Sequence, residues 1–260
     1  DRSLLIYIPS YNAASFLEQT VRRIPWSQLP PETGYRILFV DNKSTDSTLD
    51  AIQRARHELA ALGQSSDLIA HPRNLGYGGS VKSAIRYALD NGFDYLAVLH
   101  ADGQYAPELL PELIRNLLKE PRAALHFGSR LSGQPLRGGM PLYKFLANHL
   151  LSGLQNLCSG LRLTEYHSGY RLYRLEHLAR IPWQRLSDGF VIDNEIIFMI
   201  HNAGFLITES PIPTFYGAEK SHVPRIGTPL AILRNLFEYG LSRAGLRSDP
   251  RYVSGASRQL

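Results

Sequence analysis

Short apolar runs alternate with helical patterns along the first half of the chain. The apolar runs predict strands at residues 4–8, 36–40, 67–71, 95–99 and 123–127. Helical patterns lie between them: at residues 14–24, from the capping residues 44–47 to residue 62, at residues 80–90, and from Pro107 onwards. Strands and helices in this alternation form right-handed βαβ units. We therefore predict an α/β fold with a Rossmann-like, mostly parallel sheet and helices on both faces.

The second half of the chain predicts mainly helices. Residues 142–160 have the pattern of an amphipathic helix, with an apolar stripe made of Leu142, Leu146, Leu150, Leu154 and Leu157. Further helices are expected at residues 187–203 and from Thr228 onwards. Because no repeat or linker interrupts the pattern, we expect one α/β domain over residues 1–220. Residues 221–260 would form a C-terminal helical extension, packed on the domain or lying at a membrane surface.

Polar residues follow four of the predicted strands directly. In a parallel sheet these positions meet at the carboxyl edge, where ligands bind. Asp102 follows the most apolar strand, and a carboxylate there suits a Mg²⁺ or Mn²⁺ ion that bridges phosphates. His100 and Gln104, two residues away on either side, can add a donor from the same face. A solvated turn is the alternative interpretation of Asp102.

Two further polar clusters suit a nucleotide. Asp41 ends its strand and can accept hydrogen bonds from a base or ribose, and Ser44 opens a run of helix-capping residues. Gly76 begins a glycine-rich segment before the next helix, where backbone N–H groups and the helix dipole favour an anion. Simple capping and a plain turn are the structural alternatives, because the spacing matches neither a dinucleotide fingerprint nor a P-loop.

Composition narrows the class of protein. With 44% hydrophobic and 20% charged residues, the chain of 260 residues is typical of a globular protein. Its net charge of +5 suits an anionic small molecule or an anionic membrane surface. A nucleic-acid partner is not expected, because neither a binding motif nor a basic stripe is present. Cys158 is the only cysteine, which favours a reducing, cytoplasmic setting, and no apolar stretch approaches the roughly 20 residues of a membrane span.

Taken in order, these motifs resemble those of the family-2 glycosyltransferases, which are inverting enzymes of the A-type glycosyltransferase fold. The resemblance covers about residues 4–220 and rests on Ile8-Pro9-Ser10-Tyr11-Asn12, Val40-Asp41-Asn42-Lys43-Ser44-Thr45-Asp46, Asn74-Leu75-Gly76-Tyr77-Gly78-Gly79 and Ala101-Asp102-Gly103-Gln104. It implies that Pro9, Tyr11 and Asp41 line the base and ribose pocket of a GDP- or UDP-linked sugar, with Ser44 and Gly76 among the nucleotide-binding residues. It also implies that Asp102 binds the metal that holds the diphosphate.

One position departs from the metal motif of that family, which is Asp-x-Asp. His100 stands where the first aspartate is expected. Imidazole is a tolerable ligand for Mn²⁺ and a poorer one for Mg²⁺. The substitution therefore predicts either weaker metal binding or a hydrogen-bonding role for His100. Asn42, where relatives often carry a second aspartate, is a milder change.

The second half of the chain is similar to the dolichyl- or polyprenyl-phosphate glycosyltransferases of the family. The similar segments are Gly128-Ser129-Arg130, the helix that carries Lys144, and Ser168-Gly169-Tyr170-Arg171. The resemblance implies that Arg130 and Lys144 bind a lipid phosphate. Such an acceptor is already an anion, so its attack on the sugar needs no general base. A hydroxyl acceptor would need one, and Asp193 and Glu195 are then the candidates.

A polyprenyl acceptor would place the protein at the inner face of the membrane. The helices at residues 142–160 and 228–243 have the composition for peripheral membrane contact, although such apolar stripes more often pack in the core. Lys220 and Arg225 are candidates for contact with anionic lipid or with the donor. Two other functions stay open: transfer to a hydroxyl in a polysaccharide or glycoconjugate, and a catalytically silent module that binds nucleotide sugars.

Overall fold

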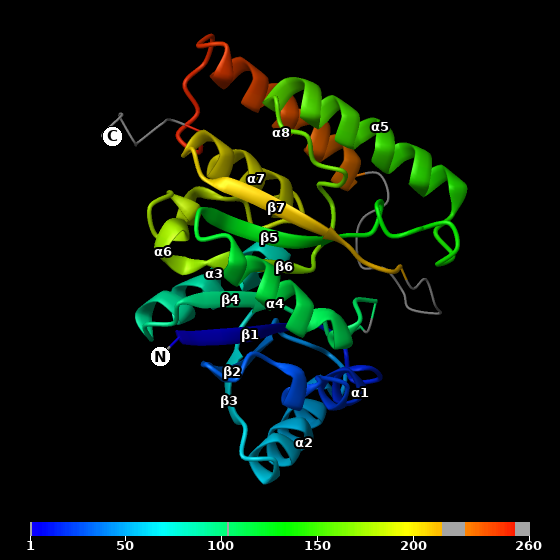
Figure 1. The fold of residues 1–260 in the computed structure, drawn as a ribbon, viewed down its shortest axis with the longest axis vertical. Coiled ribbons are helices and arrows are strands. Elements are labelled where there is room, and N and C mark those ends of the chain that lie inside the picture. Colours follow the sequence, from blue (N-terminus) through cyan, green and yellow to red (C-terminus); the bar gives the residue numbers. More distant parts are fainter. Residues whose placement is uncertain (1, 103, 215–226, 253–260) are drawn as a thin grey trace.

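A seven-stranded sheet forms the centre of the computed structural model, which describes residues 2–102, 104–214 and 227–252 (Figure 1). The strands are β1 (Arg2–Ser10), β2 (Thr33–Asp41), β3 (Ser65–Ala70), β4 (Tyr95–Val98), β5 (Ala123–Ser129), β6 (Arg171–Arg174) and β7 (Leu206–Pro211). Across the sheet they lie in the order β3-β2-β1-β4-β6-β5-β7. β6 runs antiparallel to both of its neighbours, and the other pairs are parallel. The predicted mostly parallel α/β sheet is confirmed.

Helices cover both faces of this sheet, as predicted. They are α1 (Leu17–Arg22), α2 (Thr48–Ala61), α3 (Gly76–Asp90), α4 (Leu110–Lys119), α5 (Leu142–Ser159), α6 (Leu175–Leu178), α7 (Ile192–Asn202) and α8 (Gly227–Arg243). Short 3₁₀ turns lie at Trp26–Gln28, Pro107–Leu109 and Trp183–Arg185. The turn at Pro107 leads directly into α4, because proline fits the first turn of a helix but not its interior.

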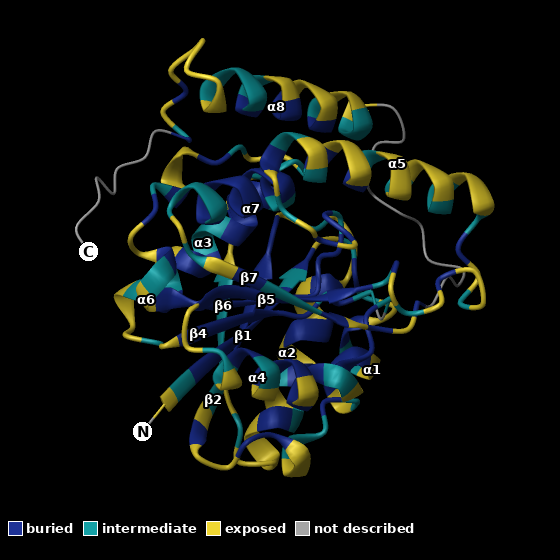
Figure 2. Ribbon diagram, turned by 45° about the horizontal axis from the view of Figure 1, so that its top comes forward, coloured by how far each residue is buried: buried dark blue, intermediate teal, exposed yellow. Residues whose placement is uncertain are grey.

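The apolar residues of the central strands alternate between two cores, one on each face of the sheet, and Figure 2 shows these strands as buried. On β1, Leu4, Ile6 and Ile8 pack with residues of α1, α2 and α4, whereas Leu5 and Tyr7 pack with residues of α3 and α7. All five side chains are buried. Because helices cover both faces, the strand is apolar throughout rather than alternately apolar and polar.

The second half of the chain contains elements that the sequence did not predict. β6, α6 and β7 were missed; β6 has only four residues, two of them arginines. The helix expected at residues 187–203 begins only at Ile192. The helix expected from residue 80 begins earlier, at Gly76, so the glycine-rich segment is its first turn.

The antiparallel course of β6 decides which motifs meet. Because β6 runs against β4 and β5, its first residue, Arg171, lies at the edge where β4 and β5 end. Arg171 pairs with Phe127, near the end of β5. The motif that precedes β6 therefore lies against His100, in the loop after β4, and next to Arg130, directly after β5.

The two long helices α5 and α8 pack against each other beyond α7 (Figure 1). α8 buries Leu236 and Tyr239 in the core around α7. In α5, by contrast, the buried residues are Ser152, Gln155 and Ser159, and the predicted apolar stripe is exposed. An apolar stripe of this kind more often packs in the core, but in α5 that expectation is wrong.

The C-terminal region is described only in part. None of the helices in the described ranges combines the length and the apolar character that a membrane crossing requires. The predicted boundary between residues 220 and 221 lies outside the described residues, as do Lys220 and Arg225.

Candidate active site

The loops that follow β1 and β2 are tied together by Asn12. Its side-chain oxygen accepts a hydrogen bond from the backbone N–H of Thr45 (2.8 Å), and its own N–H donates to the hydroxyl of Ser44 (3.0 Å). Asn12 has a positive φ of 51°, which asparagine tolerates better than most residues. Two predicted nucleotide residues precede Asn12: Pro9 lies near the end of β1 and Tyr11 just after it, so the structure brings both to the same edge as Ser44.

Asp41 ends β2 at this edge of the sheet. The residue is 2% exposed, and its carboxylate oxygens lie 3.3 and 3.4 Å from the backbone nitrogen of Ser44, which donates to them. Asp46 has a local role instead: its carboxylate accepts the N–H of Thr48 at the start of α2 (3.0 Å). Asp46 thus bonds to the segment that begins α2, whose N-cap residue is Ser47. A nucleotide contact of Asp41 stays a prediction.

Asn42 organises the loop after β3. Its side-chain oxygen accepts hydrogen bonds from the ring Nδ1 of His71 and from the N–H of Leu75, each at 2.9 Å. Its amide group donates to the side chain of Asn74 (3.0 Å) and to the carbonyl of Gly76 (3.1 Å). A carboxylate could not donate the last two bonds. This explains why an asparagine, rather than an aspartate, suits this position.

The glycines in the first turn of α3 are required by a neighbouring segment of the chain. Gly78 donates its N–H to the carbonyl of Asp188 (2.8 Å), and a Cβ at Gly78 would lie 2.3 Å from the carbonyl oxygen of Ser187. The N–H of Gly76 is taken by the side chain of Asn74 (2.8 Å). Close packing, rather than an anion at these N–H groups, explains the glycines. A nucleotide contact of Gly76 through other atoms stays a prediction.

Asp102 lies in the loop after β4 and is half-buried. Its Oδ1 accepts the backbone N–H of Gln104 (3.1 Å). Across the described residues, no three His, Cys, Asp or Glu side chains gather in a way that could hold a metal ion. A Mg²⁺ or Mn²⁺ ion at Asp102 stays a prediction; such an ion would take most of its ligands from a diphosphate and from water. Asp102 would be its protein ligand, and ligation by the Gln104 side chain stays a prediction.

His100 is packed among aromatic rings. Its imidazole stacks on Tyr77, with ring centroids 5.7 Å apart, and lies 5.3 Å from the ring of Tyr105. The ring Nε2 lies 3.5 Å from the Tyr77 hydroxyl and would be 2.4 Å from a Cβ at Gly169. Because Nε2 faces protein atoms, any bond from His100 to a metal would use Nδ1. The same packing explains why Gly169 has no side chain.

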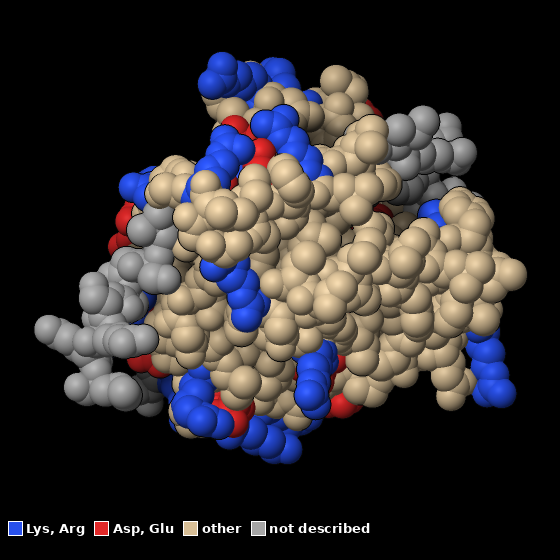
Figure 3. Space-filling view, turned by 90° about the horizontal axis from the view of Figure 1, so that it is seen from above, with Lys and Arg blue, Asp and Glu red and all other residues tan. Residues whose placement is uncertain are grey.

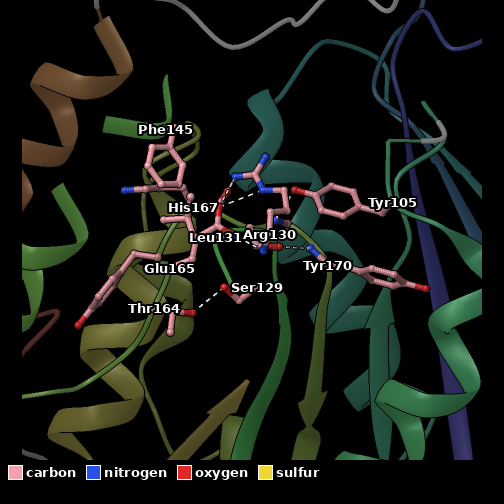
Figure 4. A network of polar contacts seen from close by, with 12 residues as sticks. Tyr105, Ser129, Arg130, Leu131, Phe145, Thr164, Glu165, His167 and Tyr170 are labelled. Atoms are coloured by element: carbon pink, nitrogen blue, oxygen red, sulfur yellow. Dashed lines mark hydrogen bonds and ion pairs between the residues drawn. The ribbon is translucent and has the colours of Figure 1, made fainter. Parts of the chain in front are cut away.

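Arg130 is held by Glu165 (Figure 4). Glu165 is fully buried and forms an ion pair with the guanidinium of Arg130, in which Nε and Oε1 are 3.0 Å apart. The same carboxylate accepts the backbone N–H of Arg130 (2.7 Å), and the guanidinium also donates to the carbonyl of His167 (3.2 Å). Burial acts to raise the pKa of Glu165, but Arg130 outweighs it, so the pKa is lowered. The predicted phosphate-binding arginine is thus fixed in position by a buried carboxylate.

Asp193 lies in the first turn of α7 and faces the same region. Its carboxylate is 3.4 Å from Nε of Arg171, whose Nη1 also donates to the backbone carbonyl of Asp193 (2.6 Å). Burial raises the pKa of Asp193, while the positive charge of Arg171 and interaction with His100 act in the opposite direction. The contact with Arg171, the first residue of β6, thus holds Asp193 at the edge of the sheet where β4 and β5 end.

Two candidates remain: Glu195 as a general base and Lys144 as a ligand of the acceptor phosphate. Glu195 is 1% exposed and is occupied on both oxygens: Ser187 donates its N–H to one (2.7 Å), and Arg251 pairs with the other (2.6 Å). It anchors the segment after α8, which argues against a role as a base.

Lys144 lies in the first turn of α5 and is half-buried. Its contact with an acceptor phosphate stays a prediction.

Two important residues of the site have roles that the sequence did not predict. Glu165 belongs to none of the predicted motifs, although a lone glutamate shortly before Ser168 and Gly169 could have suggested a partner for an arginine. Arg171 was included in the acceptor region, but it is fully buried and donates to the carbonyls of Ser168 (2.7 Å) and Tyr166 (3.0 Å). It therefore positions Asp193 and the preceding loop rather than contacting an acceptor.

Comparison with known proteins places these motifs in a family. The profile of Glycosyl transferase family 2 matches residues 5–181. An undecaprenyl-phosphate mannosyltransferase of Micrococcus luteus is 30% identical over 80% of this chain and 82% of its own length. A UDP-N-acetylglucosamine–dolichyl-phosphate N-acetylglucosaminyltransferase of Methanococcus voltae is 25% identical over 83% of this chain and 87% of its own.

Solved structures show the same fold. Glucosyl-3-phosphoglycerate synthase of Mycobacterium tuberculosis, in complex with Mn²⁺, uridine diphosphate and phosphoglyceric acid, superposes with a TM-score of 0.63 at 16% identity. The superposition covers 95% of this chain and 80% of that one. A second structure of that protein holds Mg²⁺ and uridine diphosphate and has a TM-score of 0.61. The fold is thus the A-type glycosyltransferase fold, and with a family profile that matches most of its length, the chain belongs to glycosyltransferase family 2.

Proposed function

We propose that the protein is an inverting glycosyltransferase that moves a sugar from a GDP- or UDP-linked donor to a polyprenyl phosphate. The observation that carries the proposal is the arginine held by a buried carboxylate, Arg130 with Glu165; Arg130 follows β5 at the same edge of the sheet at which Asp102 follows β4. In this arrangement Asp102, through a metal ion, would hold the donor diphosphate, and Arg130 would bind the phosphate of the acceptor. Relatives named for undecaprenyl-phosphate and dolichyl-phosphate substrates support the same acceptor class.

On the donor side, Pro9, Tyr11, Asp41 and Ser44 would bind the base and ribose, because the loops after β1 and β2 are joined there by Asn12. A Mg²⁺ or Mn²⁺ ion at Asp102 would neutralise the charge of the departing diphosphate. The structural neighbour that holds uridine diphosphate with Mn²⁺ or Mg²⁺ supports a divalent ion in this fold.

On the acceptor side, a phosphate oxygen attacks the anomeric carbon from the face opposite the diphosphate. The bond from that carbon to the donor oxygen breaks, and the nucleoside diphosphate leaves with the electron pair, so the configuration inverts. An ionised phosphate has no proton to lose in this step. Arg130 and Lys144 would align the acceptor and reduce the repulsion between the two anions.

A hydroxyl acceptor is the second candidate, and one observation favours it. Burial raises the pKa of Asp193, and a raised pKa brings a carboxylate closer to that of a general base active near neutrality. In this alternative, Asp193 would remove the proton of the attacking hydroxyl. Arg171, which contacts both the carboxylate and the backbone of Asp193, would hold it in place.

The proposal implies a location. A nucleotide sugar is soluble, whereas a polyprenyl phosphate stays in the bilayer. The protein would therefore work at the inner face of the membrane, where the cytoplasm supplies the donor.

The decisive experiment measures release of nucleoside diphosphate from a panel of GDP- and UDP-sugars, with Mn²⁺ or Mg²⁺, with and without a short-chain polyprenyl phosphate in detergent. We expect release that requires the lipid phosphate, is abolished by EDTA and falls at least about 100-fold in Asp102→Asn. Asp50→Asn, an exposed carboxylate on α2, is the matched control and should retain full activity.

Other outcomes would redirect the proposal. Release that needs a sugar or glycan hydroxyl instead of the lipid phosphate would establish the second candidate. Nucleotide binding without release from any donor would make the protein a silent binding module.

A further inference from the structure

The apolar side of α5 faces away from the protein. Six large residues on it are between 36% and 82% exposed: Leu142, Tyr143, Leu146, Leu150, Leu154 and Leu157. At 3.6 residues per turn, they fall within about 120° of the helix circumference. The buried positions Ser152, Gln155 and Ser159 lie on the opposite side. The helix is therefore amphipathic in the reverse sense to a helix packed on a core.

Polar contacts hold α5 in this orientation. Gln155 donates to the side chain of Asn194 on α7. Asn156 accepts the N–H of Leu163 (3.0 Å) and donates to its carbonyl (2.8 Å), and it also accepts the hydroxyl of Tyr166 (2.8 Å). These bonds fix which side of α5 faces the protein, so the exposed leucines do not result from a loosely placed helix.

α8 extends the same apolar surface. Leu230, Leu233 and Phe237 are 60%, 42% and 67% exposed, while Leu236 and Tyr239 on the other side of the helix are buried. Because α5 and α8 pack side by side, the two rows together form one surface, which we call the docking face. Figure 3 views this side of the molecule and shows a broad area without charged side chains. Monomeric proteins rarely leave an apolar surface of this kind uncovered unless it binds something.

The charges around the docking face favour an anionic occupant. α5 contains no aspartate or glutamate, and its one charged residue is Lys144. Arg137 and Arg162 lie exposed in the segments before and after α5, and Arg247 lies exposed after α8. The one acid of α8, Glu238, pairs with Arg234 (3.0 Å) and with a second arginine. A two-fold contact between copies of this chain would bring these arginines against one another, whereas anionic lipid would neutralise them.

We propose that the docking face binds an anionic lipid bilayer, with α5 and α8 lying in the plane of the membrane and their leucines inserted among the acyl chains. An apolar row flanked by Lys and Arg is the pattern of helices that lie at the membrane interface. This inference concerns adsorption of the protein and does not require that the proposed transfer reaction takes place. It also places the first turn of α5, with Lys144, at the bilayer surface.

The test is flotation of the purified protein with vesicles of phosphatidylcholine alone or with about one third phosphatidylglycerol, in the absence of donor and acceptor. We expect binding to the anionic vesicles, and weaker binding to the neutral ones. Leu150→Glu should lower the partition coefficient at least about tenfold, because it places a charge among the acyl chains. Leu62→Glu is the matched control: Leu62 is 65% exposed, as against 66% for Leu150, but it follows α2. It should bind as the unchanged protein does.

Three results would overturn the inference: equal binding of the two variants, no binding to anionic vesicles, or a dimer in sedimentation velocity that Leu150→Glu converts to a monomer. Far-UV circular dichroism checks that both variants fold. Failure here is separate from failure of the proposed function. Nucleoside diphosphate release from the donor, assayed with a short-chain acceptor in detergent, does not need docking, and vesicle binding without substrates does not need catalysis.

Discussion

The buried carboxylate of Glu165 contacts Arg130 through both the side chain and the backbone. One oxygen lies 3.0 Å from Nε of the guanidinium, and the other accepts the backbone N–H at 2.7 Å. Glu165 also accepts the N–H of Leu131 (3.3 Å). One acid therefore fixes both the loop after β5 and the direction of the arginine that we assign to the acceptor.

Replacing Glu165 by glutamine tests this role. Glu165→Gln keeps the shape of the side chain but leaves the guanidinium of Arg130 without its counter-charge. We expect the free energy of unfolding, measured in urea, to fall by about 3 kcal/mol. This value is at the low end for breaking a buried ion pair, because the Arg130 side chain keeps some exposure to solvent. The KM for the acceptor should rise more than that for the donor.

The exposed Glu112→Gln on α4 is the control for loss of one negative charge. If Glu165→Gln raised both KM values equally, Glu165 would support the fold in general and not the acceptor position in particular.

The contact between Gly169 and His100 gives a second prediction. A Cβ at Gly169 would lie 2.4 Å from Nε2 of His100, whose ring is confined by Tyr77 and Tyr105. Gly169→Ala should therefore cost about 1–3 kcal/mol of stability, as overpacking typically does. In a His100→Ala background the clash is absent, and the same change should cost less than about 0.5 kcal/mol. Urea unfolding of the four proteins in this double-mutant cycle measures the difference; an equal cost in both backgrounds would refute the contact.

The parallel half of the fold could be predicted because its strands are buried on both faces. A continuous apolar run such as residues 95–99, flanked by helical patterns, is typical of a central parallel strand. β6 could not be predicted in this way. It is four residues long, and Arg171 and Arg174 are buried there only because backbone carbonyls outside the strand accept their hydrogen bonds. Nothing in the local sequence marks those carbonyls.

The same reasoning separates the site residues that could be predicted from those that could not. The positions of Asp41 and Asp102 could be predicted because Asp41 ends its strand and Asp102 lies in the loop after the central strand β4, at the carboxyl edge of the sheet. Glu165 and Asn42 act through contacts with residues 29 to 35 positions away, which only the fold brings together. The exposed face of α5 was ambiguous for a related reason: periodicity identifies the apolar side of a helix but not what that side contacts.

Acid should destabilise the protein through buried histidines. Burial lowers the pKa of His126 from 6.5 to about 4, and its ring lies 2.8 Å from the hydroxyl of Thr208. In the unfolded chain this histidine takes up a proton first, so its contribution to stability is complete above pH 6.5 and is lost as the pH falls towards 4. The loss amounts to about 3 kcal/mol.

Urea unfolding at several pH values between 7 and 4 measures this loss. His126→Asn should flatten the dependence of stability on pH, whatever it does to stability at pH 7. His57→Asn, at an exposed position of α2, should leave the slope unchanged. Identical slopes for His126→Asn and the unchanged protein would rule out His126 as a source of acid lability.

Asp193→Asn distinguishes the two acceptor classes. Arg171 bonds to the backbone carbonyl of Asp193 (2.6 Å) as well as to its carboxylate, so the amide variant should keep the local geometry. With a lipid phosphate as acceptor no base is needed, and we expect kcat to stay within about tenfold of the unchanged protein. With a hydroxyl acceptor, loss of the base should lower kcat by about 10²–10⁴. The pH profile gives an independent measurement: a base at Asp193 must be ionised, so activity would fall as the pH drops through its raised pKa, and that limb would vanish in Asp193→Asn.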